Sequence, residues 1–241
     1  MLDVGCGAGT AEIGLGVQRL SQVRFFGVDR DPARARAAVS DTASLNIDMG
    51  VAVGDALQLP FQAASFDAVF CVAVLQHVTD LSGAVAEFAR VSRPGARVVA
   101  VEPDNSARYW YSSCETGMQA FDLGRRFQAA LATATGSVTE AGVGPRVSAM
   151  FVRHAITPIA VRLFPVSVAR LGSPDGDIWA VRQKAIGAQV AACPDGALRR
   201  LGSDYLKAVD RYADEAAAAG PAFVEIQNTL LMATVGQRAD A

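Results

Sequence analysis

The sequence has few cysteines and histidines, and they are not grouped. Its four cysteines stand at positions 6, 71, 114 and 193, so no two of them form a CxxC pair. Neither of the two histidines lies near enough to a cysteine to indicate a zinc site. Scattered cysteines of this kind are typical of small buried side chains in a reducing compartment. We therefore expect no metal site.

Long apolar runs and an excess of one charge are also missing. The longest apolar stretch, 68–75, is far too short to span a bilayer, and no basic segment followed by an apolar run begins the chain. Lys and Arg number 22 against 24 Asp and Glu, which leaves a net charge of −2. Such a balance gives no electrostatic footprint for nucleic acid or an anionic membrane. We expect a soluble, cytoplasmic protein with neither partner.

What the sequence has is apolar material in a regular order. Hydrophobic residues make up 51% of the 241 positions, enough for one large domain or one domain with a sizeable insertion. Strand and helix signals alternate over about the first hundred residues. Strands are expected at 2–4, 23–28, 49–53, 66–74 and 96–101, and helices at 11–22, 32–44 and 81–91. This order predicts an α/β, Rossmann-like doubly wound sheet with helices on both faces.

The second half is less regular. We expect a helix over 121–141, a strand over 146–156, and a last strand over 222–235. Between the last two lies a mixed, mostly helical region with a turn at 172–175. The predicted division is therefore a core over 1–157, a mostly helical insertion over 158–220, and the final core strand with the C-terminal tail over 221–241. Because specificity elements often lie at the carboxyl edge of such sheets, our hypothesis is that the insertion forms a lid over the substrate.

A glycine-rich turn follows the first strand, in the segment Leu-Asp-Val-Gly-Cys-Gly-Ala-Gly-Thr at 2–10. Glycines let a backbone turn sharply and approach a ligand, and the helix that follows points free N–H groups at it. Asp3 adds an acceptor for a cation such as an amino-acid ammonium. A dinucleotide site would need its third glycine at position 10, where this chain has Thr10. A turn without a ligand is the remaining alternative.

Two further carboxylates end predicted strands. Asp29 closes the second strand, where a carboxylate can accept hydrogen bonds from both ribose hydroxyls of a nucleoside. Asp55 follows the third strand, where it can accept from an exocyclic adenine amine. Each alone is an ordinary loop aspartate, but the set formed with the glycine turn is not ordinary and indicates a ligand site at one sheet edge.

Five motifs in order carry a resemblance to a known family. They are D-x-G-x-G-x-G at 3–9, the acidic end of the second strand at 29, G-D-A-x-x-L-P-F at 54–61, S-F-D-x-V with L-x-H-V at 65–69 and 75–78, and R-x-x-R-P-G-x-x-V at 90–98. The chain resembles the class I S-adenosylmethionine-dependent methyltransferases, in particular those with the type 11 methyltransferase domain. After Asp104 the resemblance is only architectural.

The resemblance implies a seven-stranded sheet, mostly parallel with the last strand antiparallel, and S-adenosylmethionine as the cofactor. Asp3 and the glycine turn would hold the methionine moiety, Asp29 the ribose, and Asp55 with Ala56 the adenine. The cofactor-binding residues implied are Asp3, Gly5, Cys6, Gly7, Gly9, Asp29, Arg30, Asp55, Ala56, Val72 and Gln76. The expected activity is methyl transfer to a small-molecule acceptor with an O, N or C nucleophile, by in-line displacement.

Residues for the transfer itself are less well indicated. His77 is the candidate general base by residue type, although the family often uses a histidine here for positioning. His154 is a weaker candidate. Tyr109, Trp110 and Tyr111 follow the fifth strand and are either substrate-pocket aromatics or core packing. Asp104 and Glu102, near the same edge, either contact substrate or are solvated.

One departure from the family bears on function. Relatives usually have one or two helices before the first strand, whereas here that strand begins at once. An S-adenosylmethionine-binding module without catalytic activity therefore remains the alternative to an enzyme. An NAD-dependent oxidoreductase is disfavoured by the glycine spacing and by Asp55. The sequence indicates neither the acceptor nor the oligomeric state.

Overall fold

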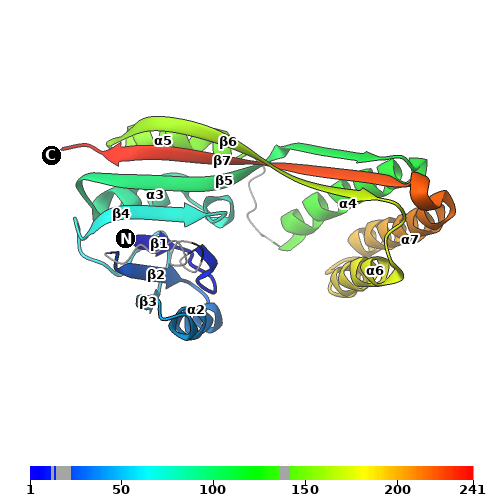
Figure 1. Cartoon of the computed structure of the whole chain (residues 1–241), viewed down its shortest axis with the longest axis horizontal. Coiled ribbons are helices and arrows are strands. Elements are labelled where there is room, and N and C mark those ends of the chain that lie inside the picture. Colours follow the sequence, from blue (N-terminus) through cyan, green and yellow to red (C-terminus); the bar gives the residue numbers. More distant parts are fainter. Residues whose placement is uncertain (12–13, 15–22, 136–141, 241) are drawn as a thin grey trace. The chain divides into compact units, whose positions relative to one another are not determined.

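A computed structural model describes residues 1–11, 14, 23–135 and 142–240. The chain divides into two units: 1–106, 140–164 and 230–241 form the first, and 107–139 with 165–229 form the second. Three of the four points at which the chain passes from one unit to the other lie within long strands, β5 (Ser92–Ser112), β6 (Ile156–Leu171) and β7 (Val224–Arg238). Figure 1 shows these strands side by side.

The sheet has seven strands in the order β3-β2-β1-β4-β5-β7-β6. The four strands not yet given are β1 (Leu2–Val4), β2 (Phe25–Asp29), β3 (Met49–Val53) and β4 (Phe66–Val72). All pairings from β3 to β5 are parallel, and β7 runs antiparallel to β4 and β5 (Figure 1). The order reverses between β1 and β4, which is where a doubly wound sheet binds its ligand. The predicted Rossmann-like fold, including the antiparallel last strand, is confirmed.

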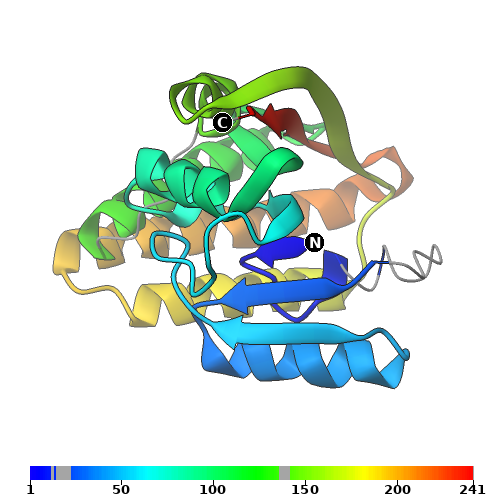
Figure 2. The same ribbon diagram turned by 90° about the vertical axis from the view of Figure 1, so that its left-hand side faces the viewer.

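Helices cover both faces of the sheet in the first unit. Helix α2 (Pro32–Ser44) packs on β2 and β3, and Figure 2 shows it as the blue helix beside these two blue strands. Its start follows local rules, because the Asp31 side chain accepts from the Ala33 N–H and a proline occupies the first turn. On the other face, α3 (Leu81–Val91) and α5 (Val147–Arg153) bury apolar side chains against β1, β4 and β5. Two separate apolar clusters result.

Three predicted elements need correction. The predicted strand over 146–156 is wrong, since 147–153 form α5. Its buried residues Val147, Met150 and Phe151 have the spacing of a helix face rather than the alternation of a strand. Residues 158–171, expected in the mostly helical insertion, belong instead to β6. Pro158 and Pro165 disfavour a helix here, whereas β6 is an edge strand of the sheet and can contain proline. The third correction concerns the fifth strand, which continues from 101 to Ser112 and so contains Tyr109 to Tyr111.

Most other boundaries agree closely. Strands β2 and β4 differ from the expected ranges by two residues, and α3 matches its prediction. The predicted helix over 11–22 falls almost entirely outside the described residues. So does the end of the predicted helix over 121–141, whose described part is α4 (Glu115–Thr135). Among the described residues, no helix is both long and apolar enough to cross a bilayer, and no cluster of three metal-ligating side chains occurs.

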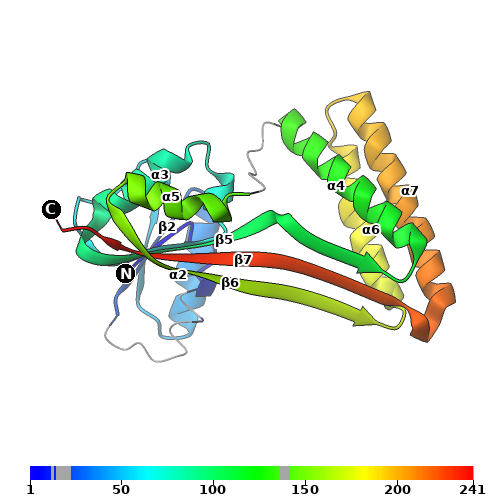
Figure 3. The same cartoon turned by 90° about the horizontal axis from the view of Figure 1, so that it is seen from above.

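The second unit packs three helices beside its strand segments. They are α4, α6 (Gly176–Ala191) and α7 (Gly196–Ala219), grouped together in Figure 3. Its main core is rich in aromatic rings, with Trp179, Tyr212 and Phe223 in mutual edge or tilted contact. The role of 158–220 as a substrate lid stays a prediction.

A buried carboxylate ties this core together. Glu225 of β7 is fully buried, and Arg170 of β6 and Arg182 of α6 donate to it at 2.5 and 3.1 Å. The Tyr212 hydroxyl donates to its second oxygen at 2.8 Å. Burial opposes ionisation of Glu225, but the hydrogen bonds and charge of Arg182, with Tyr212 and Arg170, hold its pKa below the usual value. The ionised carboxylate thus stabilises the unit.

We predict that Glu225→Gln lowers the free energy of unfolding of this unit by about 3 kcal/mol, because it leaves two arginines without their buried counter-charge. Both tryptophans of the chain, Trp110 and Trp179, lie in the second unit, so tryptophan fluorescence in a urea titration reports on it. Because the pKa of Glu225 is depressed in the fold, the difference between wild type and variant should shrink as the pH falls below 4.5.

The control is Asp122→Asn, which removes a solvent-exposed pair with Arg125 and should change stability little. Equal urea midpoints for Glu225→Gln and Asp122→Asn would show that the buried network does not hold the unit together.

Candidate functional site

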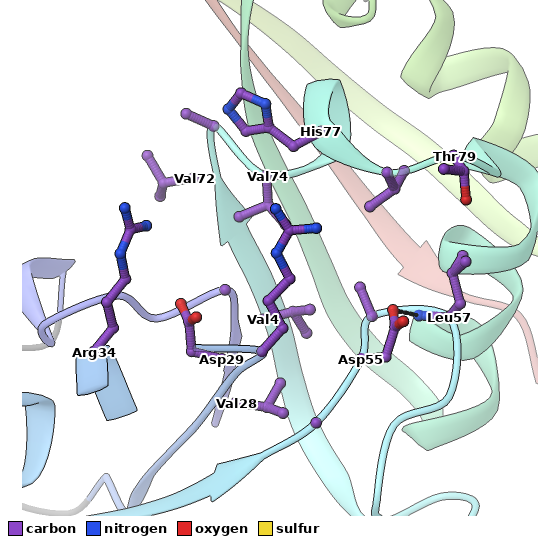
Figure 4. Close-up of a pocket in the computed structure, with 16 residues that line it drawn as sticks. Val4, Val28, Asp29, Arg34, Asp55, Leu57, Val72, Val74, His77 and Thr79 are labelled. Carbon is purple, nitrogen blue, oxygen red and sulfur yellow. Dashed lines mark hydrogen bonds between the residues drawn. The ribbon is translucent and has the colours of Figure 1, made fainter. Parts of the chain in front are cut away.

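A cavity of about 350 Å³ opens at the carboxyl ends of β1 to β4, within the first unit (Figure 4). Its walls come from four loops and the start of α2. The lining residues are Val4, Gly5, Val28, Asp29, Arg30, Arg34, Gly54, Asp55, Ala56, Leu57, Val72, Ala73, Val74, His77, Val78 and Thr79. The volume lies at the lower end of the range for small-molecule pockets. The structure therefore brings six of the predicted cofactor residues, and the candidate base His77, to one cavity.

The glycine turn forms the floor of the cavity at Gly5. Its backbone has φ +77°, a left-handed conformation that glycine adopts without strain, and its N–H donates to the Val28 carbonyl at 2.7 Å. A Cβ on Gly5 would lie 2.4 Å from Cγ2 of Val74. Only glycine therefore lets the turn and the loop after β4 meet at this distance.

The other predicted residues of the turn do not line the cavity. Asp3 is 3% exposed and lies on β1, paired with Gly27 of β2 and Phe70 of β4. Cys6 is also buried, and its sulfur packs close to Gly27 in the cluster on the α2 side of the sheet. Gly7 and Gly9 both have positive φ, and Gly9 packs against α2. These residues therefore determine the conformation and packing of the turn but do not line the cavity.

Asp29 connects the turn to α2. Its two carboxylate oxygens accept from the N–H groups of Gly7 and Asp31, each at 2.9 Å, and the residue is only 7% exposed. Each oxygen keeps a further lone pair for a ligand hydroxyl. The side chain thus both fixes the loop and presents an acceptor to the cavity, as Figure 4 shows.

The loop after β3 forms the opposite wall. The exposed Asp55 accepts from the Leu57 N–H at 2.9 Å, drawn as a dashed line in Figure 4, and this local bond shapes the turn that carries Ala56 and Leu57. On the rim, two exposed arginines contribute, Arg30 and Arg34. Arg34 was missed by the sequence analysis, although it lies in the first turn of the helix predicted at 32–44, directly after the loop that carries Asp29 and Arg30.

The loop between β4 and α3 closes the cavity on its third side, and its support was also missed. Ala73 has φ +56°, and residues 75–77 form a single 3₁₀ turn. The carboxylate behind this turn is Glu102 of β5, which was expected to be solvated or to touch substrate but is fully buried. Val98, Ala100 and Glu102 alternate along the core face of the strand. That alternation is the signal that could have identified Glu102 as an inward-facing residue.

Burial has a marked effect on the groups behind this wall. It raises the pKa of Glu102 above the usual value, against the opposing effect of hydrogen bonds from the Leu75, Val74 and Gln76 N–H groups. Cys71 is fully buried beside it, and burial, then the charges of Glu102 and Asp3, raise its thiol pKa well above normal. Cys71 is therefore a neutral thiol and no nucleophile.

The remaining predicted residues lie away from the cavity lining. Gln76 is 7% exposed and hydrogen-bonds to Asn105 and to the Ala73 carbonyl. Asp104 is 8% exposed and accepts from the Ser106 N–H. His154 contacts the Ser82 hydroxyl at 2.8 Å.

The three aromatic candidates, Tyr109, Trp110 and Tyr111, belong to the second unit. Trp110 packs edge-on against Phe121 at 4.8 Å between ring centroids, whereas Tyr109 and Tyr111 are exposed.

Comparison with known proteins agrees with this geometry. Residues 2–100 match the family described as methyltransferase domain. The resemblance to class I S-adenosylmethionine-dependent methyltransferases is thus confirmed for this part of the chain, and S-adenosylmethionine is the cofactor of such domains.

Curated relatives match over a similar length of the chain. Norajmaline N-methyltransferase of Rauvolfia serpentina is 30% identical over 99 residues, 41% of this chain and 34% of the relative. Demethylmenaquinone methyltransferase of Deinococcus radiodurans is 36% identical over 102 residues, 42% of each chain. The match therefore spans well under half the length of either relative.

Solved structures extend the fold likeness beyond the matched domain. A candidate methyltransferase of Bacillus halodurans aligns with 99% of this chain and 92% of its own at a TM-score of 0.60 and 14% identity. Geranyl diphosphate methyltransferase in complex with SAM aligns with 99% of this chain and 77% of its own, at a TM-score of 0.53 and 15% identity. At these identities the likeness shows the shared fold of the methyltransferase domain and nothing of the substrate.

Substituting Gly5 in this methyltransferase domain tests the packing of the cavity floor. We predict that Gly5→Ala destabilises the domain by roughly 3 kcal/mol, since it adds a clash with Val74 to the left-handed strain. Gly7→Ala is the matched control: φ is +56° there, but nothing lies within 4 Å of the added Cβ, so about 1 kcal/mol of strain is expected. Urea unfolding followed by circular dichroism measures both, and equal losses would contradict the contact.

Proposed function

We propose that the chain transfers a methyl group from S-adenosylmethionine to a small-molecule acceptor. The observation that carries this proposal is the arrangement of Gly5, Asp29 and Asp55 around one cavity, at the ends of three adjacent strands. Curated relatives include methyltransferases named for norajmaline and for demethylmenaquinone, which supports a small-molecule acceptor here.

The residues present fit an adenosyl amino acid. Asp29 has lone pairs left to accept from the vicinal ribose hydroxyls after it has bound the Gly7 and Asp31 N–H groups. Asp55, exposed at the opposite wall, would accept from the adenine amine, with Ala56 and Leu57 beside the ring. Gly5 offers the close backbone approach that the methionine moiety needs, and the buried charge of Asp3 below it favours the cationic end of the donor.

The sulfonium of S-adenosylmethionine supplies an electrophilic methyl group, so the protein's own part is to bind, orient and exclude water. Val72, Val74 and Val78 give one wall of the cavity an apolar surface beside the nucleoside site. His77 lies on the same loop and would accept a proton from an acceptor whose nucleophile is protonated.

Replacement of Asp29 tests the donor site. Asp29→Asn should weaken S-adenosylmethionine binding about tenfold or more, because an amide accepts through one atom only and the hydrogen bond lost is to a charged group. Isothermal calorimetry measures the dissociation constant.

The matched control is Asp31→Asn, two residues away, which keeps an N-cap side chain on α2 and should bind the donor as wild type does. If Asp29→Asn bound as tightly as wild type, or if the wild type took NAD rather than S-adenosylmethionine, the donor site would be wrongly assigned.

The two histidines of the chain allow a paired test of proton transfer. An acceptor is first identified by incubating metabolite pools with an isotopically labelled methyl donor. His77→Asn should then lower kcat about 100-fold and remove the acidic limb of the pH–rate profile, with donor affinity unchanged. His154→Asn, which breaks a contact to Ser82, should leave kcat unchanged. A kcat for His77→Asn within twofold of wild type would leave His77 no role as a base.

A further inference from the structure

A fully buried carboxylate stands directly behind one wall of the cavity. Val101 of β5 pairs with Val72, the last residue of β4, and Glu102 is the next residue along the strand. Its side chain continues the core face of Val98 and Ala100, where an apolar residue would ordinarily be found. A carboxylate without partners in such a position would cost several kcal/mol, so its hydrogen bonds decide whether it is tolerated.

Those hydrogen bonds all go to the loop between β4 and α3. One oxygen of Glu102 accepts from the N–H groups of Val74 and Leu75 at 2.9 and 2.8 Å, and the other accepts from Gln76 at 3.3 Å. These N–H groups begin the 3₁₀ turn and have no partner within it. A second residue of β5 also binds this loop, because the Asn105 amide donates a hydrogen bond to the Gln76 side chain at 3.0 Å.

The loop needs such an anchor. Ala73 adopts φ +56°, a left-handed conformation that a residue with a Cβ seldom takes, immediately before the three N–H groups. On the cavity side, Val74 lies against the glycine turn so closely that any side chain at Gly5 would collide with it. The loop is therefore fixed from behind by Glu102 and in front by Gly5.

We propose that Glu102 is a positioning residue of the donor site, which holds the β4–α3 loop so that Val74 and His77 face the cavity. The identity of the ligand in this proposal rests on the proposed function. The placement of the β4–α3 loop by Glu102 does not depend on that function. The residue acts through the backbone of the turn and contacts neither donor nor acceptor.

Two substitutions distinguish the effect of the length of the Glu102 side chain from the effect of its charge. Glu102→Gln keeps the length of the side chain and one accepting oxygen, but it presents an NH₂ group to at least one backbone N–H. Glu102→Asp keeps the charge, but the shorter side chain cannot reach all three N–H groups. A positioning role predicts that S-adenosylmethionine binds about tenfold more weakly to Glu102→Gln and more weakly still to Glu102→Asp. An effect of charge alone predicts near wild-type binding by Glu102→Asp, and that result would overturn the proposal.

A second readout needs no ligand. The chain has two histidines, so proton–carbon NMR of the imidazole rings gives two signals, assigned with His154→Asn. Both Glu102 variants should shift the His77 signal, whereas the His154 signal should stay in place. Glu87→Gln is the control: Glu87 also accepts a backbone N–H, from Leu59 at 2.7 Å, but neither Leu59 nor its partner Arg90 lines the cavity. It should leave the His77 signal unchanged.

The outcomes keep the two proposals apart. If the wild type binds S-adenosylmethionine and Asp29→Asn weakens it, while Glu102→Gln binds within twofold of wild type with an unmoved His77 signal, then Glu102 is no positioning residue and the donor site stands. If the wild type does not bind the donor at all but the His77 signal still moves in both Glu102 variants, the proposed function fails and the anchoring of the loop stands.

Discussion

The structure depends on carboxylates that accept the free N–H groups of its turns. At the carboxyl edge of a parallel sheet each strand gives way to a loop, and the backbone groups there lose their ladder partners. Asp29 accepts two of these N–H groups, from Gly7 and Asp31, and Glu102 accepts three from the turn after β4. The walls of the cavity are therefore fixed before any ligand binds, and ordering of these loops adds little to the free-energy cost of binding.

The second unit uses the same residue type for a different purpose. Glu225 is as deeply buried as Glu102, but its partners are the side chains of Arg170, Arg182 and Tyr212 rather than backbone groups. Charged partners depress its pKa, whereas Glu102, held by neutral N–H groups, has a raised pKa. One carboxylate thus joins helices and strands through side chains, and the other shapes a loop through the backbone.

Features set by neighbouring residues could be predicted from the sequence. The Asp31-Pro32 start of α2 and the glycine turn are local signals, and the strands that lead to them agree with the structure to within two residues. Because parallel strands bring their carboxyl ends to one edge, the order of strands was enough to place Asp29 and Asp55 at the same cavity. Only the alternation of strands and helices was needed for that inference.

Features that depend on distant contacts could not be predicted in this way. Val74 and Gly5 are far apart in sequence, and nothing near either residue shows that a valine occupies the space which a side chain at Gly5 would need. The error at 146–156 has another origin. The helix there has only seven residues with three buried positions, and a segment of that length is too short for its apolar pattern to distinguish a helix from a strand in the sequence. Glu102 was missed because the strand was expected to end one residue before it, so its alternation with Val98 and Ala100 was not followed.

Burial also separates the carboxylates that shape the cavity from the one left open to a ligand. Glu102 is fully enclosed and spends both oxygens on backbone N–H groups, whereas Asp55 is exposed and one of its oxygens shapes its own turn. Asp29 lies between these extremes, nearly buried yet part of the cavity wall. A group that must hold a loop gains from exclusion of water, since each hydrogen bond is stronger there. A group that must exchange water for a ligand is better left at the rim, where desolvation costs less. The placement of the three carboxylates therefore follows from what each must bind, a backbone, a ligand, or both.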